Sequence, residues 1–87
     1  MYVLLVYDVG EKRVGKMLKL CRRYLHWIQN SVFEGEITEV KLKELIIKAK
    51  YLMNEEIDSL IIFSGRDERW LEKQIVGHER STLDNIL

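Results

Sequence analysis

The sequence predicts an α+β fold of the ferredoxin-like type, in which two helices cover one face of a four-stranded antiparallel sheet. Two short apolar runs are rich in β-branched and aromatic residues, two longer stretches have helical spacing, and the elements follow the order strand, helix, strand, strand, helix, strand. The 87 residues leave room for one domain, over residues 1–87. Because a chain of this size buries a modest core, we expect a homodimer whose second copy covers the open face of the sheet.

The first two elements are a strand and a helix. The apolar run Tyr2–Tyr7 predicts a strand buried on both faces, which ends at Asp8 and is broken by Gly10. Residues 11–25 predict a helix, because apolar residues recur at intervals of three and four along one face. This stripe comprises Val14, Met17, Leu18, Cys21 and Leu25. We expect the Cys21 thiol to be an inert part of the core.

The middle of the chain predicts two more strands and a second helix. The composition of residues 26–33 is typical of a strand, and Gly35 separates it from the short segment Glu36–Ile37. Gly35 therefore predicts a tight hairpin or a bulge at this point. Thr38 is expected to cap a second helix that runs to about Met53.

The last part of the chain is less regular. Residues 58–64 predict a second strand buried on both faces, and Gly65 ends it. Residues 70–76 are compatible with a strand or a helical turn, and residues 82–87 with a short strand or a frayed tail. We expect one additional strand in this C-terminal region.

Composition excludes several classes of protein. The chain has 14 basic and 14 acidic residues, so its net charge of zero argues against a uniformly basic nucleic-acid binder. The single Cys21 excludes an internal disulfide and a cysteine-rich zinc site. No apolar run approaches the ~20 residues of a membrane helix, and the first apolar run lacks a basic leader. We therefore expect a cytoplasmic protein that does not enter a membrane.

The expected first helix carries an unusual run of positive charge. Residues 12–23 hold six basic side chains and no acidic one: Lys12, Arg13, Lys16, Lys19, Arg22 and Arg23. Four of them repeat at the helical period on the face opposite the apolar stripe: Lys12, Lys16, Lys19 and Arg23. One interpretation is a surface that contacts a polyanion, because such contacts position a phosphate backbone without reading its sequence. The other is an ordinary solvated helix face.

Asp8 is the most suggestive acidic residue, since it stands at the carboxyl end of an apolar strand, directly before the basic helix. An aspartate before a glycine often forms a turn or caps the next helix, which is the structural interpretation. The functional interpretation is a ligand for a hard metal ion. Mg²⁺ is usually held by one or two carboxylates together with water and phosphate oxygens, so one Asp8 per chain is enough if two chains meet.

Several stretches of the chain resemble the small CRISPR-associated protein two family. Residues 2–9, the following helix with Arg13, and above all residues 29–36, Gln-Asn-Ser-Val-Phe-Glu-Gly-Glu, carry this resemblance. Residues 55–62 and 76–79 are similar to the second half of the family. The similarity spans most of the chain and preserves the family's length and order of elements.

The resemblance implies a ferredoxin-like homodimer whose two strand-end aspartates, here Asp8, face each other and bind Mg²⁺ or another divalent cation. It implies that residues 1–64 form the core and that the extension at residues 65–87 takes part in dimer formation. It also implies metal-dependent cleavage of single-stranded RNA or duplex DNA, with Asp8 as the catalytic residue. Tyr7, Ser31 and Phe33 are expected to support the dimer or the active site.

A role in acquiring new spacers is also implied by the resemblance. In that family the protein lies between dimers of the CRISPR-associated integrase, protein one, and duplex DNA crosses it. The nucleic-acid contacts map onto Lys12, Arg13, Lys16, Lys19 and Arg23. Three functional hypotheses follow: a metal-dependent endonuclease, a non-catalytic DNA-binding adaptor in which Asp8 is structural, and a small regulatory or toxin-like dimer without a CRISPR role.

Overall fold

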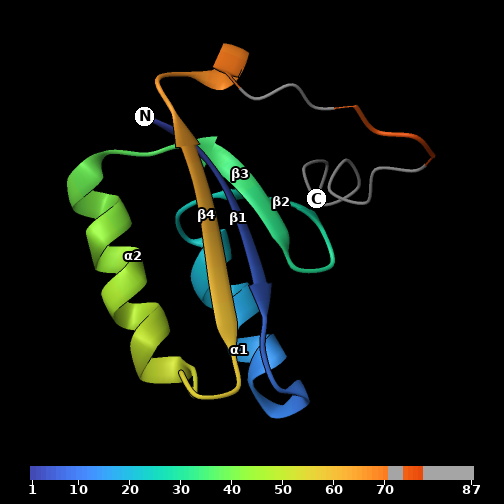
Figure 1. The fold of residues 1–87 in the computed structure, drawn as a ribbon, viewed down its shortest axis with the longest axis vertical. Coiled ribbons are helices and arrows are strands. Elements are labelled where there is room, and N and C mark those ends of the chain that lie inside the picture. The colour runs from blue at the N-terminus through green and yellow to red at the C-terminus, as the bar shows by residue number, and fades with distance from the viewer. Residues whose placement is uncertain (71–73, 78–87) are drawn as a thin grey trace.

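The computed structural model of the chain describes residues 1–70 and 74–77. Its elements follow the predicted order (Figure 1). They are β1 (Tyr2–Asp8), α1 (Glu11–Arg22), β2 (His26–Gln29), β3 (Val32–Glu36), α2 (Glu39–Leu52), β4 (Ser59–Gly65) and a short 3₁₀ helix, η1 (Glu68–Trp70). None of the described helices is both long enough and apolar enough to cross a membrane.

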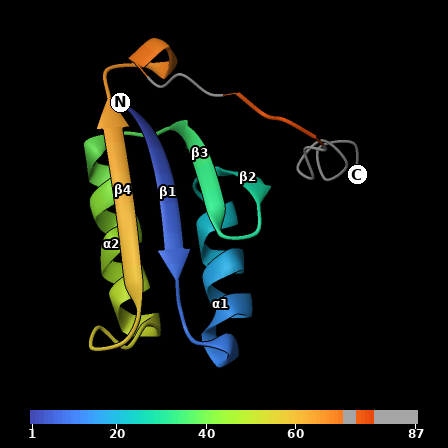
Figure 2. The same cartoon turned by 45° about the vertical axis from the view of Figure 1, so that its right-hand side comes forward.

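The four strands form one antiparallel sheet in the order β2-β3-β1-β4. Strand β1 is central and pairs with β3 on one side and β4 on the other, so that Leu5 lies between Phe33 and Ile62. Both helices lie behind the same face of the sheet in two views of the ribbon (Figures 1 and 2). This arrangement confirms the predicted α+β fold of the ferredoxin-like type.

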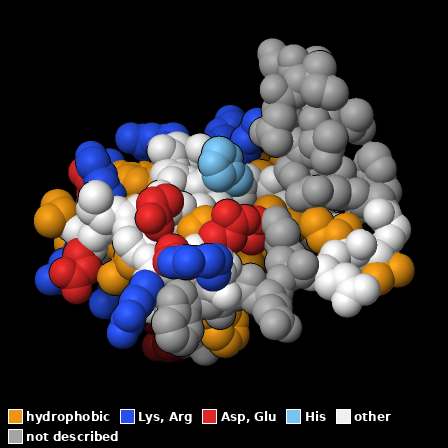
Figure 3. Space-filling view, turned by 90° about the horizontal axis from the view of Figure 1, so that it is seen from above, with side chains coloured by type: hydrophobic (Ala, Val, Ile, Leu, Met, Phe, Trp, Pro, Cys, Tyr) orange, Lys and Arg blue, Asp and Glu red, His pale blue; other side chains and the backbone are white. Residues whose placement is uncertain are grey.

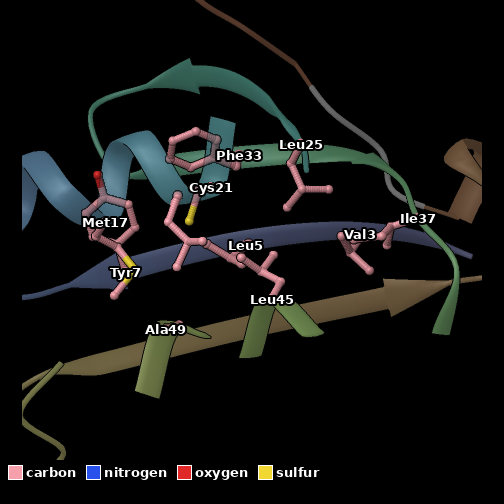
Figure 4. Packing of buried hydrophobic residues seen from close by; sticks show 11 residues of the cluster. Val3, Leu5, Tyr7, Met17, Cys21, Leu25, Phe33, Ile37, Leu45 and Ala49 are labelled. Atoms are coloured by element: carbon pink, nitrogen blue, oxygen red, sulfur yellow. The ribbon is translucent and has the colours of Figure 1, made fainter. Parts of the chain in front are cut away.

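The core lies between the sheet and the two helices. Alternate residues of β1 point into it, because successive side chains of a strand face opposite sides of the sheet. Figure 4 shows these β1 side chains packed against residues of α1, β3 and α2. The fully buried members include Val3, Leu5, Met17, Cys21, Phe33, Leu45 and Ala49. Burial raises the pKa of the Cys21 thiol to about 12, so the prediction of an inert core thiol is consistent with the structure.

The hairpin between the second and third strands lies earlier than the sequence predicted. The segment over residues 26–33 is divided at Asn30, whose backbone adopts a left-handed conformation with φ of 45°. Asparagine tolerates this conformation better than most residues, which explains a turn without glycine. Gly35 lies inside β3, opposite Val3, and is neither the hairpin turn nor a bulge. The predicted break at Gly35 is therefore wrong.

The expectation that the first and last strands are buried on both faces is wrong for the single chain. Both helices cover the same face, so the other face of β1 and β4 is only partly buried. Ile61 and Phe63 of β4 are 50% and 52% exposed on that face. Leu4 and Val6 lie opposite them on β1 and are half-buried. The sheet therefore presents an apolar face to its surroundings.

The helix boundaries agree with the sequence to within three residues. Helix α1 ends at Arg22 rather than residue 25. Helix α2 begins after Thr38, whose side chain accepts a hydrogen bond from the Lys41 amide at 3.1 Å, which confirms the predicted cap. The predicted C-terminal strand falls mainly outside the described residues, and the described stretch 74–77 contains no strand.

Candidate functional site

Asp8 is the last residue of β1, opposite Ser59 on β4, and its side chain is exposed. It does not cap the next helix, because the N-cap of α1 is Gly10 and no side-chain hydrogen bond is made there. Among the described residues, no hydrogen bond or ion pair engages the Asp8 carboxylate. The capping interpretation is thus not supported, and the carboxylate oxygens are accessible to a ligand.

A hollow of about 280 Å³ opens beside Asp8. The backbone amide of Tyr7 donates to the Ser31 carbonyl at 3.1 Å, and this bond ties the β2–β3 hairpin to the end of β1. The hollow therefore combines one carboxylate with neutral polar groups from a different part of the chain. Its lining comprises Tyr7, Asp8, Val9, Val14, Asn30 and Ser31.

Asn30 is a lining residue that the sequence analysis did not identify. Its carbonyl accepts a hydrogen bond from the Trp27 indole nitrogen at 2.9 Å, which fixes the left-handed turn. The signal that was available is the pair Asn30-Ser31, since both residue types are common in turns. The pair was overlooked because the composition of residues 26–33 predicts one continuous strand.

The donor atoms in this hollow suit a hard cation only if further ligands join them. Among the residues that the structure describes, no three histidine, cysteine, aspartate or glutamate side chains lie close enough to hold a metal ion. One carboxylate with neutral oxygens nearby is compatible with Mg²⁺, which retains water and takes oxygen ligands from substrate phosphates. The chain therefore fits a metal that is shared with a second carboxylate or with a bound phosphate.

Tyr7 lines the hollow with part of its side chain, and Phe33 lies behind it without lining the hollow. Tyr7 is 3% exposed and Phe33 is fully buried, and their rings stack with centroids 6.0 Å apart. Burial raises the pKa of the Tyr7 phenol, and its hydroxyl has no hydrogen-bond partner among the described residues. Their packing supports the strand that carries Asp8. A role for them in a dimer stays a prediction.

Arg13 has a partner within the chain. Its Nε and Nη2 atoms donate to the Asp58 carboxylate at 2.6 and 2.9 Å. The Asp58 side chain is only 1% exposed, and the hydrogen bonds from Arg13 hold the pKa of this carboxyl well below its usual range. The Arg13 guanidinium is thus engaged by a partner within the chain, and its role toward nucleic acid stays a prediction.

Three of the predicted nucleic-acid contacts, Lys16, Lys19 and Arg23, lie together. With Leu20 of the same helix and Lys48 and Leu52 of α2, they line a groove of about 340 Å³ between the two helices. Among the described residues, this groove contains no carboxylate in its lining. Lys12 is exposed on the first turn of α1 and does not line the groove.

Lys48 was missed by the sequence analysis, because the spacing within one helix cannot show which residues of another helix face it. Its Nζ donates to the Tyr24 hydroxyl at 3.0 Å, and that hydroxyl donates to Glu44 at 3.0 Å. Hydrogen bonds from Tyr24 and Lys41 lower the pKa of Glu44. This network holds Lys48 at the edge of the groove.

The fold and the site define a class of protein: a small ferredoxin-like α+β chain with an accessible strand-end carboxylate and a basic helix. Residues 1–73 match the model of the family described as CRISPR associated protein Cas2. The chain belongs to this family.

Individual relatives agree with this assignment. The CRISPR-associated endoribonuclease Cas2 of Dictyoglomus turgidum is 47% identical over 87 residues, which is 100% of both chains. That of Methanothermobacter thermautotrophicus is 45% identical over 86 residues, covering 99% of this chain and 94% of the relative. A crystal structure of cas2 superposes with a TM-score of 0.84 at 41% identity, covering 93% of this chain and 91% of the solved one.

Proposed function

We propose that this protein is a metal-dependent endoribonuclease of a CRISPR system, with Asp8 as its catalytic metal ligand. The observation that carries the proposal is the exposed Asp8 carboxylate, which no described residue engages and which lines a hollow with neutral oxygen atoms. The curated relatives carry the name endoribonuclease, which favours single-stranded RNA over duplex DNA as the substrate. A nucleic-acid substrate also favours action in the cytoplasm.

The chemistry divides between the ion and the side chains. A bound Mg²⁺ would lower the pKa of a water molecule and offset negative charge at the scissile phosphate. Asp8 would hold this ion through a carboxylate oxygen. The Ser31 hydroxyl and the Asn30 amide line the same hollow and can donate hydrogen bonds to phosphate or ribose oxygens. Lys16, Lys19 and Arg23 would bind the phosphate backbone of the nucleic acid.

A homodimer would complete the site. The face of the sheet opposite the helices carries Leu4, Val6, Ile61 and Phe63, which are only partly buried in the single chain. Packing two such faces together removes apolar area from water and brings together two copies of the strand end that carries Asp8. We propose that residues 1–64 form the core of this single domain and that residues 65–87 take part in the dimer.

A DNA-binding adaptor for the CRISPR-associated integrase, protein one, is the second candidate. The observation that favours it is the groove between α1 and α2, which gathers Lys16, Lys19, Arg23 and Lys48 without an acidic residue in its described lining. Contacts of this kind bind duplex DNA without sequence preference. In this candidate Asp8 takes no part in catalysis, and the protein contributes to spacer acquisition by positioning DNA.

The test of the first candidate compares the wild-type protein with Asp8→Asn. We expect cleavage of labelled single-stranded RNA to require Mg²⁺, to stop with chelator, and to fall at least ~100-fold in the variant. Glu55→Gln is the matched control, because Glu55 is another exposed acidic residue, in the loop before β4. Light scattering should show a dimer for all three proteins.

Two outcomes would contradict the nuclease proposal. Equal cleavage by wild type and Asp8→Asn would mean that the activity does not come from this site. Absence of metal-dependent cleavage from both RNA and duplex DNA, with retained DNA binding, would support the adaptor instead.

A further inference from the structure

We propose that Arg13 and Asp58 form a positioning clamp that fixes the turn after β1 and thereby sets the position of Asp8. Neither residue would touch the metal or the nucleic acid. The inference rests on the proposed function, because it concerns the geometry of the Asp8 metal site. It also replaces the nucleic-acid role that the sequence predicted for Arg13.

Asp58 accepts four hydrogen bonds from three parts of the chain. Its Oδ1 atom accepts from the Gly10 amide at 2.9 Å and from Arg13 Nη2 at 2.9 Å. Its Oδ2 atom accepts from Arg13 Nε at 2.6 Å and from the Asn54 amide at 2.8 Å. Because each oxygen accepts two hydrogen bonds, the Asp58 carboxylate is held in a single orientation.

The clamp closes a short ring through the candidate site. Gly10 follows Asp8 by two residues, and Asp58 precedes Ser59, which pairs with Asp8 across the sheet. The end of β1 and the start of β4 are therefore connected twice, once by the β1–β4 ladder and once by the hydrogen bond from Gly10 to the Asp58 carboxylate. A change in the clamp moves the turn relative to β4, and Asp8 is the ladder residue nearest to that turn.

The environment of the clamp makes it rigid. The Arg13 side chain is 27% exposed and the Asp58 side chain 1%, so solvent screens the pair weakly. Two parallel hydrogen bonds between a guanidinium and a carboxylate fix orientation as well as distance. Because two of the guanidinium nitrogens already serve Asp58, Arg13 is poorly placed to grip a phosphate with the same pair of donors.

Gly10 offers a way to disturb the clamp without changing any charge. A Cβ atom at this position would lie 3.0 Å from Arg13 Cζ and closer still to Nη2. The backbone of Gly10 has φ of −57° and ψ of 147°, which alanine adopts freely. The Gly10→Ala methyl group therefore has to push the guanidinium away from Asp58.

The experiment compares Gly10→Ala with Gly15→Ala. Gly15 lies on α1 with nothing within 4 Å of an added Cβ, so it is a matched control. For single-stranded RNA we expect Gly10→Ala to lower kcat at least ~10-fold while KM stays within about twofold, since a displacement near 1 Å can cost ~100-fold. In NMR spectra, Mn²⁺ should broaden the Asp8 and Val9 signals of wild type and Gly15→Ala at lower concentration than those of Gly10→Ala.

Arg13→Lys is the second variant, for use if Gly10→Ala does not fold. It keeps the positive charge but cannot form the two parallel bonds. A positioning role predicts a lower kcat at unchanged KM, together with faster hydrogen exchange at the Gly10 amide. A phosphate contact predicts a raised KM at unchanged kcat and unchanged exchange, and that result would overturn the proposal.

The remaining outcomes separate the two proposals. If the wild-type protein neither cleaves RNA with metal nor shows Mn²⁺ broadening at Asp8, the metal site fails, and the clamp proposal fails with it. If wild type does both and folded Gly10→Ala matches it in kcat and in Mn²⁺ response, the metal site stands and the clamp proposal alone is overturned.

Discussion

The carboxylates at the two ends of β1 lie in different environments. At the Tyr2 end, acidic side chains lie near a histidine and a basic side chain when the molecule is seen from above (Figure 3). Burial, with the nearby charges of Glu34, Glu68 and Glu36 and a hydrogen bond to Glu34, raises the pKa of Tyr2 to about 12. At the other end, Asp8 is exposed and no described residue engages it, whereas Asp58, the residue directly before β4, is buried and accepts hydrogen bonds with both carboxylate oxygens.

This difference shows how one strand can offer two kinds of surface. At the Tyr2 end, the nearby carboxylates add to the effect of burial on the pKa of Tyr2, and one of them, Glu36, pairs with the N-terminal ammonium at 3.7 Å. A single accessible carboxylate beside a basic helix can share a cation with a phosphate instead. The Asp8 end is therefore the end suited to nucleic acid, although both ends contain acidic residues.

The largest expected effect comes from removing the charge of Asp58 with Asp58→Asn. The variant leaves Arg13 without its buried partner, so we expect the melting temperature at neutral pH to fall by at least ~10 °C. The pKa of Asp58 lies below its unfolded value of ~3.9. Its stabilisation is thus present above about pH 4 and is lost as the pH falls further towards the folded pKa, so the acid dependence should become shallower in the variant.

Thermal unfolding between about pH 7 and about pH 2, followed by circular dichroism, checks this prediction. Asp67→Asn is the control, because Asp67 pairs with the 88% exposed Arg69 and surface pairs contribute little. Equal melting temperatures for wild type and Asp58→Asn would show that the Arg13–Asp58 pair contributes nothing to the stability of the Asp8 end.

An intermediate effect is expected from replacing two basic residues of the groove between α1 and α2 by acidic residues. The double variant Lys16→Glu, Lys19→Glu should weaken binding of RNA or duplex DNA at least ~10-fold and lower the salt dependence of log K by about one to two. The control is Lys43→Glu, Lys50→Glu, which changes the net charge equally on exposed positions of α2. Equal losses from both double variants, measured by fluorescence anisotropy across a salt series, would show that only total charge matters.

The smallest expected effect concerns the Tyr2 end itself. Glu34→Gln removes one charge and replaces a charged hydrogen-bond acceptor by a neutral one, so the pKa of Tyr2 should fall from about 12 towards its ordinary value of ~10. Because a raised phenol pKa favours the folded state only while the phenol is protonated, wild-type stability should decline between about pH 10 and about pH 12. The variant should show a narrower decline. Tyrosinate absorbance during alkaline titration, with Tyr2→Phe as the reference, measures this shift.

Much of the fold could be predicted because its signals are local. Thr38 lies directly before a helical pattern, and Asp8 directly follows an apolar run. The start of α2 and the end of β1 can therefore be predicted from adjacent residues. The β2–β3 hairpin was misplaced for the opposite reason. The Asn30 turn depends on the pairing of β3 with β1. Each β1 residue from Tyr2 to Val6 pairs with a β3 residue at least 26 positions later in the sequence.

The candidate site was predicted only in part. Asp8 and Ser31 were both identified, and the structure places them in one hollow. The spacing along α1 could not show that Arg13 turns to Asp58, a residue 45 positions further along the chain. Lys48 was missed for a similar reason, since its place in the groove depends on the packing of α2 against α1.

The burial of Cys21 gives the protein an internal reporter of its own opening. The thiol is fully buried and its pKa is raised to about 12, so the reactive thiolate is almost absent while the core is closed. A thiol reagent can modify Cys21 only after α1 has separated from the sheet. The rate of modification therefore measures how often that separation occurs, without a label or an added residue.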